Sequence, residues 1–182
     1  MLIVDDYIRV TQVLSPYNDF SKVPPQRLKE AQIRGTAVHD FCELYALSLL
    51  IEPVPLEYKI YFDCFVNWFE EYVEEVINAE ERIYHPELRF CGKYDLLCRF
   101  KGDKRIVLVD YKTPLNSHRA WQLQSAAYFL LLRDIRKVDV QRRITLRLSP
   151  VGNPAKVNEY TNHERDIAMF LDALRLHFFF NS

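Results

Sequence analysis

The chain has 182 residues, a length typical of one domain (residues 1–182), and its 49% apolar content allows a substantial core. A formal net charge of −1 gives no global sign of a nucleic-acid binder, and only four glycines argue against glycine-rich phosphate loops. The sequence has no apolar run of the roughly 18 residues that cross a membrane. Its start, MLIVDDYIRV, lacks the basic segment of a secretion signal. We therefore expect a cytoplasmic protein without membrane contact.

The first predicted elements are helices. Thr11 is a candidate N-cap for a short helix, and a proline pair begins a helix over residues 26–33. A second helix is expected over residues 35–50, where prolines end it. Apolar residues spaced by three and four predict a long helix over residues 56–78. The part of the chain from residue 8 to 78 is thus expected to be helical.

From residue 79 onward the pattern alternates between strand and helix. The expected order is three strands, a helix, a strand and a closing helix, over residues 81–84, 90–100, 105–111, 120–136, 143–148 and 164–179. Residues 156–160 are expected to pair back onto the strand before them. Residues 79–182 thus supply a sheet and its covering helices. We predict an α/β (α+β) fold with a central mixed β-sheet flanked by helices.

Acids and a lysine stand at the ends of two predicted strands. Asp110 and Lys112 follow an apolar strand, and they project from the same face because strand side chains alternate. Asp95 lies within the preceding strand, where acids are uncommon. Counting outward from a tight turn at residues 102–103 places Asp95 opposite Asp110. Facing carboxylates repel, so either a divalent cation lies between them or each pairs with a basic side chain.

Such a group can perform hydrolysis at a phosphate. Carboxylate oxygens bind hard divalent cations, and a neighbouring lysine can hold or deprotonate a water, or neutralise charge on phosphate. A histidine on a nearby helix could add a ligand, although a lone histidine is more often an ordinary core or surface residue. The residues alone leave both readings open.

Four motifs occur in a fixed order along the chain, namely Gly35-Thr36-Ala37-Val38-His39, Gly92-Lys93-Tyr94-Asp95, Asp110-Tyr111-Lys112-Thr113 and Gln124-Ser125-Ala126-Ala127-Tyr128. Together they resemble the GxxxH, GxxD, DYKT and QxxxY motifs of RecB-like nucleases in the PD-(D/E)xK superfamily. The opening Val10–Leu14 is also similar to phage-type exonucleases and to mitochondrial genome maintenance exonucleases. The resemblance spans about residues 8 to 178. It implies a single nuclease domain with a restriction-endonuclease-like core, and a phage or bacterial source is compatible with it.

The resemblance implies a site for Mg²⁺ or Mn²⁺. Its ligands would be three side chains and one backbone carbonyl, those of His39, Asp95, Asp110 and Tyr111. Lys112 would be the catalytic lysine. An acid before the first strand also belongs to the pattern, and Glu80 is carried over weakly because Glu81 competes for the position.

The implied activity is metal-dependent hydrolysis of DNA, with exonuclease action on single strands or duplex ends. Gln124 and Tyr128 lie one helical turn apart and would line the site, contacting the DNA backbone or bracing the lysine. Candidate DNA-binding residues are Arg34, Lys93, Thr113, His118 and Arg119. A further basic group is formed by Arg142, Arg143 and Arg147, which could equally be part of an ordinary solvated surface.

Other interpretations stay open. The chain could be an inactive nuclease-fold module that binds DNA or protein, an endonuclease on the same core, or a small-molecule metal hydrolase. The four cysteines are expected to be buried free thiols, and no iron–sulfur cluster is expected because no cysteine follows Cys98. The aromatic end, Phe178–Phe180, could dock on the core or mediate self-association or contact with a protein partner.

Overall fold

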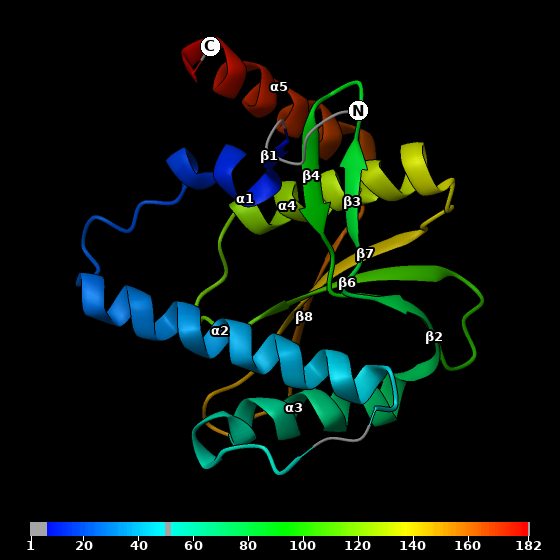
Figure 1. Ribbon diagram of the computed structural model, residues 1–182. Helices are drawn as coiled ribbons and strands as arrows, with labels where there is room; N and C mark the ends of the chain where they lie inside the picture. The colour runs from blue at the N-terminus through cyan, green and yellow to red at the C-terminus, as the bar shows by residue number, and fades with distance from the viewer. Residues whose placement is uncertain (1–6, 50–51, 182) are drawn as a thin grey trace.

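The structure, a computed structural model, describes residues 7–49 and 52–181. Two groups of helices lie on either side of a twisted sheet, and a short hairpin rises from the sheet beside the upper helices (Figure 1). In chain order the elements are β1 (Ile8–Arg9), α1 (Val10–Val13), η2 (Ser15–Tyr17), α2 (Pro25–Ala46), α3 (Leu56–Tyr72), β2 (Val73–Ala79), β3 (Arg82–His85), β4 (Phe90–Lys93), β5 (Leu96–Phe100), β6 (Ile106–Lys112), α4 (Ala120–Leu131), η3 (Leu132–Arg136), β7 (Arg142–Arg147), β8 (Lys156–Tyr160) and α5 (His163–Asn181).

The larger sheet has five strands in the order β2-β5-β6-β7-β8. Only the β6–β7 pair is parallel in it, and α4 with η3 makes the crossover between those two strands. A smaller sheet has the order β1-β4-β3, and its strands β3 and β4 form the hairpin seen in Figure 1. The predicted fold class, a mixed sheet flanked by helices, is confirmed.

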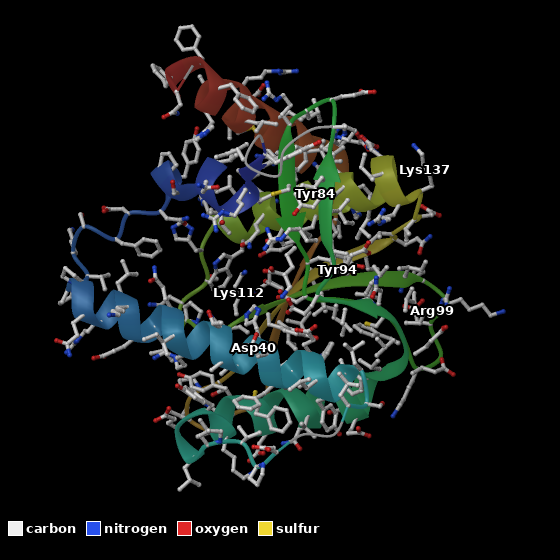
Figure 2. All side chains as sticks on the ribbon, viewed as in Figure 1. Asp40, Tyr84, Tyr94, Arg99, Lys112 and Lys137 are labelled. Atoms are coloured by element: carbon white, nitrogen blue, oxygen red, sulfur yellow. The ribbon has the colours of Figure 1, made fainter. Side chains whose placement is uncertain are left out.

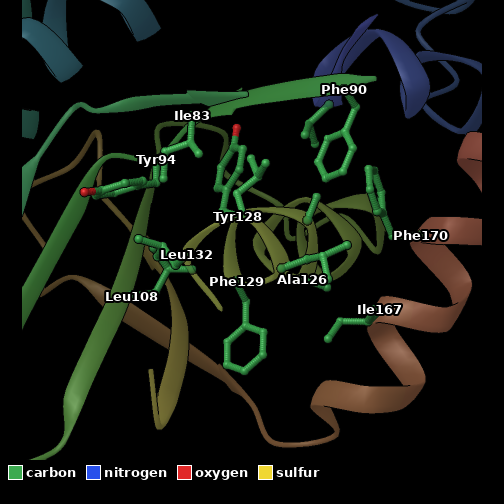
Figure 3. Close-up of a cluster of buried hydrophobic side chains, with 14 of the residues drawn as sticks. Ile83, Phe90, Tyr94, Leu108, Ala126, Tyr128, Phe129, Leu132, Ile167 and Phe170 are labelled. Atoms are coloured by element: carbon green, nitrogen blue, oxygen red, sulfur yellow. The ribbon is translucent and has the colours of Figure 1, made fainter. Parts of the chain in front are cut away.

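Two apolar cores cover the two faces of the larger sheet. Leu97 and Leu108 belong to one core together with residues of α4, α5 and α1. Figure 3 shows this cluster, with Leu108 labelled. Val107, Val109 and Tyr111 point the other way and pack against α2 and α3. Because side chains alternate along β6, Asp110 and Lys112 belong to the α4 side of the strand while Tyr111 anchors it on the α3 side.

The predicted hairpin register is confirmed. Leu96 pairs with Val109 and Leu97 with Leu108, so the same antiparallel register brings Asp95 opposite Asp110. The strand expected over residues 90–100 is nevertheless wrong as one element. It is interrupted at residues 94–95, where β4 leaves for the smaller sheet and β5 enters the larger one. Asp95 thus sits at a junction between two sheets.

The helix expected over residues 56–78 is also wrong in its second part, because it ends at residue 72 and β2 follows. The ladder between β2 and β5 contains two irregularities, and the inward residues of β2 are Val73, Val76 and Ala79. A bulge adds a residue to one strand and so turns a spacing of two into three. The apolar residues of β2 are therefore spaced by three, which continues the helical pattern of α3 in the sequence.

Two other expectations about helix boundaries differ from the structure. Arg9, rather than Thr11, caps α1, through a reciprocal contact with Gln12. The helices expected over residues 26–33 and 35–50 are one helix, because an interior glycine lowers helix stability by only about 1 kcal/mol and Gly35 does not interrupt it. Residue 50 lies outside the described residues.

The basic group on β7 is not a solvent-facing patch. Arg143 is fully buried and contacts Asp166 Oδ2 of α5 at 2.5 Å. The other Asp166 oxygen accepts a hydrogen bond from Gln122 Nε2 at 2.8 Å, and Arg143 also donates to Ser125 Oγ and His163 Nδ1. This network joins β7, α4 and α5 beneath the helical layer.

The four cysteines are buried and unpaired, as expected for small apolar side chains. At the end of α5, Phe179 and Phe180 are 75% and 76% exposed, and association through this segment stays a prediction. Within residues 7–49 and 52–181, every helix is too short or too polar to cross a membrane.

Candidate active site

A pocket of about 340 Å³ opens where α2, α4 and the junction of the two sheets meet. Figure 2 labels Asp40 on α2 and Lys112 at the end of β6, which line it from opposite sides. All four motifs contribute to its wall, through His39, Asp95, Asp110, Lys112, Gln124 and Tyr128. Residues separated by almost ninety positions in the sequence are thus brought into one hollow.

One wall of the pocket holds a cluster of three potential metal ligands. His39, Glu80 and Asp95 each place one ligand atom within 4.8 Å of the others. His39 Nδ1 lies 3.2 Å from Asp95 Oδ1 and 4.0 Å from Glu80 Oε1. Asp110 is not part of this cluster. Glu80, carried over only weakly from the sequence, is therefore a stronger candidate than the motif alone suggested.

Glu80 occupies a costly position. Its φ of 53° lies in the left-handed region that side chains other than glycine and asparagine seldom adopt. Its backbone N–H donates to the Asp95 carbonyl at 3.0 Å, which helps to hold that conformation. Strain of this kind persists where the surrounding structure fixes it, and it is common at functional sites.

The Glu80 carboxylate is nearly excluded from water. Its Oε2 forms an ion pair with Lys93, while its Oε1 has no hydrogen-bond partner among the residues that the structure describes. Burial, followed by the charge of Asp95, raises the pKa of Glu80 to about 7, against the opposing effects of Lys93 and His39. A buried oxygen without a donor is costly, and a bound cation would satisfy it.

Asp95 is held in its charged form. Burial alone would raise its pKa, but His39, Lys112 and the Tyr111 backbone N–H together lower it below the ordinary value. That N–H donates to Asp95 Oδ2 at 2.5 Å. Conversely, the charge of Asp95 raises the pKa of His39 although burial opposes it. Tyr111 itself is locked in place because its ring packs against Phe65.

The opposite wall carries a chain of polar contacts that ends at the lysine. Asp110 Oδ2 lies 2.5 Å from Lys112 Nζ, which donates to Gln124 Oε1 at 3.1 Å. Gln124 Nε2 in turn donates to the Tyr128 hydroxyl at 2.8 Å. Burial raises the pKa of Asp110 to about 6, although Lys112 lowers it. The QxxxY helix thus fixes the position of the lysine ammonium group.

Comparison with known proteins gives a family for this arrangement. The model of the PD-(D/E)XK nuclease superfamily matches residues 52–177. The chain belongs to the PD-(D/E)xK nuclease superfamily. No curated protein matches the chain. A candidate exonuclease from Eubacterium rectale has the same fold, with a TM-score of 0.57 and 9% identity over 97% of this chain and 83% of that one. An alkaline exonuclease from Laribacter hongkongensis is similar at a TM-score of 0.46, with 12% identity over 94% of this chain and 89% of that one.

PD-(D/E)xK nucleases use divalent metals, and the residues present fit such an ion. Two carboxylates and an imidazole from His39, Glu80 and Asp95 suit Mg²⁺ or Mn²⁺, which prefer oxygen ligands and tolerate nitrogen to different degrees. The unsatisfied Glu80 Oε1 and the closeness of its carboxylate to that of Asp95 are observations that a cation would explain.

The candidate DNA-binding residues of this superfamily member divide into two groups. Lys93 lines the pocket, and His118 lines a second hollow beside it. Arg34, Thr113 and Arg119 are not part of either wall, and the Arg34 guanidinium instead lies 5.6 Å from the centre of the Tyr61 ring.

Two arginines that line the pocket, Arg9 and Arg82, were missed from the sequence. Arg9 pairs with β4 from the short strand β1, and Arg82 lies opposite Lys93 in the β3–β4 ladder. Neither belongs to a recognisable motif. Only the strand pairing of the smaller sheet brings them to the site.

The pH dependence of stability tests the buried acids. The ordinary pKa values of Asp110 and Glu80 are 3.8 and 4.5, and the folded chain raises them to about 6 and about 7. Protonation thus favours the folded state, so the free energy of unfolding falls as pH rises from about 4 through 7. We expect the melting temperature of the metal-free protein to decrease between pH 5 and 8, as measured by circular dichroism.

In the same experiment Glu80→Gln should flatten this decrease, because it removes the group with the higher pKa. Glu75→Gln, at a side chain that is 54% exposed, is the control and should keep the slope of the wild type. A melting temperature that rises over this pH range would contradict the assignment.

Gly92 lets α4 approach the smaller sheet. A Cβ at this residue would lie 2.6 Å from Tyr128 Cε1 and 3.1 Å from Leu131 Cδ1. We expect Gly92→Ala to lower stability by about 1–3 kcal/mol and to displace the tyrosine that holds Gln124. Gly35→Ala is the matched control, because its Cβ would meet Thr113 Oγ1 at 3.8 Å, an ordinary contact. Denaturant unfolding should show a loss in the first variant and none in the second.

Proposed function

We propose that this chain is a divalent-metal-dependent deoxyribonuclease that hydrolyses phosphodiester bonds, most directly as an exonuclease at DNA ends or on single strands. The observation that carries the proposal is the meeting of two polar systems in one pocket. The acid–histidine cluster forms one wall, and the Asp110–Lys112–Gln124 chain forms the other. Neither system has an obvious structural task at the end of a sheet.

In this proposal, Mg²⁺ or Mn²⁺ is held by Asp95, Glu80 and His39, with Asp110 and the Tyr111 carbonyl as further ligands. When bound, the cation polarises the phosphate and lowers the pKa of water. The chain's own contribution is to keep Asp95 ionised and rigid through the Tyr111 N–H, so that the ligand does not have to reorganise.

Lys112 supplies the positive charge next to the reacting phosphate. Gln124 and Asp110 leave its ammonium group little freedom, since they contact it at 3.1 and 2.5 Å. In this position it donates to a phosphate oxygen as charge develops there, or holds the attacking water in line with the bond that breaks. Tyr128 acts one step further away, by holding Gln124.

The substrate contacts proposed here come from the basic rim of the pocket. Lys93, Arg9 and Arg82 line it and can meet phosphates of the DNA backbone. An inactive binding module is the less favoured alternative, because each of the four motifs brings its acidic, basic or hydrogen-bonding residues to the pocket, namely His39, Asp95, Asp110, Lys112, Gln124 and Tyr128. An endonuclease on the same core is distinguished from an exonuclease by the cleavage experiment below.

A panel of end-labelled DNA tests the proposal. Linear and circular molecules, single- and double-stranded, are incubated with Mg²⁺, Mn²⁺ or EDTA. We expect labelled linear DNA to be degraded with either metal, circular DNA to persist, and EDTA to abolish the reaction. Asp95→Asn should eliminate cleavage, and Asp172→Asn, at an exposed acid on α5, should not. Cleavage of circles would indicate an endonuclease, and unchanged cleavage in EDTA would overturn the metal assignment.

A further inference from the structure

A second hollow adjoins the candidate active site. It has a volume of about 250 Å³ and shares two wall residues, Thr11 and Gln124, with the larger pocket. Gln124 therefore contacts the catalytic lysine on one side and borders this hollow on the other. A group bound in the second hollow would lie directly beside a phosphate held at Lys112.

The lining of this hollow is apolar and partly aromatic. Leu14, Phe20 and Trp121 form apolar parts of its wall. Trp121 is 9% exposed, whereas Phe20 is 50% exposed without serving the core. The Lys112 ammonium, which lines the larger pocket, lies 5.9 Å from the centre of the Trp121 ring, which lines the second hollow, so the two hollows meet at this pair. Stacking on such rings is a common way to hold a nucleobase.

Polar groups surround the apolar part of the wall. Asn18, Asn116 and Ser117 offer hydrogen-bond donors and acceptors at its edge. His118 accepts the Ala120 N–H through Nδ1 at 3.2 Å, so the neutral imidazole carries its proton on Nε2 and can donate from there. An apolar ring surface with a polar edge is the pattern of a base, which has a π-face and hydrogen-bonding edges.

The size of the hollow also suits one base. A dry cavity of about 150 Å³ accepts benzene, whereas pockets for drug-sized ligands begin near about 300 Å³. A volume of about 250 Å³ lies between these limits and is suited to one nucleobase.

We propose that this second hollow is a nucleobase subsite, which holds the base of the nucleotide whose phosphate lies at Lys112. The inference rests on the proposed function, and it adds a substrate class. A base can enter only when it is unstacked and unpaired, so the preferred substrate is single-stranded DNA or a frayed end. The subsite stacks the base on Phe20 and Trp121 and contacts its edge without requiring one sequence.

The test reports on binding without cleavage. Trp68→Phe leaves Trp121 as the only tryptophan, and its fluorescence is followed during titration with pentathymidylate in EDTA. A set of pentamers carries one abasic residue at each position in turn. We expect one abasic position to abolish most of the quenching and to weaken binding by about tenfold, as loss of one stacked base implies. The other positions should change binding little.

Phe20→Ala in the same background supplies the second arm. It should weaken the intact pentamer by about fivefold to tenfold, yet leave unchanged the pentamer whose sensitive position is already abasic. Phe180→Ala is the matched control, because this exposed phenylalanine lies at the end of α5 outside both hollows. Equal effects of Phe20→Ala on both pentamers, equal effects of an abasic residue at all positions, or no quenching would overturn the subsite.

The same abasic series in the Mg²⁺ cleavage assay separates this inference from the proposed function. If the cleavage rate is the same whichever position is abasic, the subsite is overturned but the nuclease assignment is not. Position-specific binding without any cleavage would preserve the subsite and remove the proposed activity.

Discussion

Lys112→Met is expected to lower the rate of DNA cleavage by about a hundredfold to a thousandfold, as removal of a single donor to developing charge does in other enzymes. Methionine keeps an apolar stem of similar length but loses the ammonium group. The Lys112 ammonium contacts Asp110 and Gln124, and its loss leaves no cation at that point of the pocket wall. Single-turnover cleavage of labelled single-stranded DNA measures the effect.

The fold should survive this change, and a control separates charge at the site from charge in general. Lys112 lies at the end of β6. Because burial already raises the pKa of its partner Asp110 to about 6, this carboxyl can take up a proton when the ammonium is lost, so the melting temperature should change by only a few degrees. Lys104→Met, at an exposed lysine of the β5–β6 turn, should cleave at the wild-type rate. Activity of Lys112→Met near that of the control would remove the lysine from the mechanism.

The largest effect on stability is expected from Arg143→Met. Removal of the guanidinium leaves Asp166 charged and buried, a condition that costs about 3–5 kcal/mol. For a chain of this size each kcal/mol shifts the melting temperature by about 2–4 °C, so a decrease of roughly 6–20 °C should be seen in a thermal scan. Arg175→Met, which breaks the exposed pair with Asp172, should change it by about 2 °C or less.

The double variant Arg143→Met/Asp166→Leu distinguishes a lost attraction from a stranded charge. Because it removes both partners, it should recover a large part of the stability lost in the single variant. Failure to recover would mean that the hydrogen bonds from Arg143 to Ser125 and His163 contribute more than the charge pair.

Much of the candidate site could be predicted from the sequence because it lies on regular strands and helices. The turn at residues 102–103 fixes the hairpin register, so the sequence alone predicts that Asp95 lies opposite Asp110. Alternation along β6 gave the shared face of Asp110 and Lys112. Helical spacing likewise placed Gln124 and Tyr128 one turn apart.

The parts that sequence could not give are those fixed by irregular backbone. The bulges of β2 give this strand an apolar spacing that is typical of a helix. The backbone of Glu80 is in the left-handed conformation, and its carboxylate lies near His39. A position of this kind follows from tertiary contacts and not from local propensity. The choice between Glu80 and Glu81 could therefore not be made from the sequence, and the structure shows that Glu81 instead contacts Arg136 and Tyr94.

The backbone of Glu80 has a consequence for evolution. A glutamate in the left-handed conformation makes folding less favourable, and glycine or asparagine at this residue would remove most of that free-energy cost. If Glu80 is a metal ligand, as proposed above, selection for cleavage would retain a glutamate at this residue. Related proteins that have lost nuclease activity but keep the fold should more often have glycine or asparagine at this residue. The residue found there would then indicate from sequence alone whether a relative is still active.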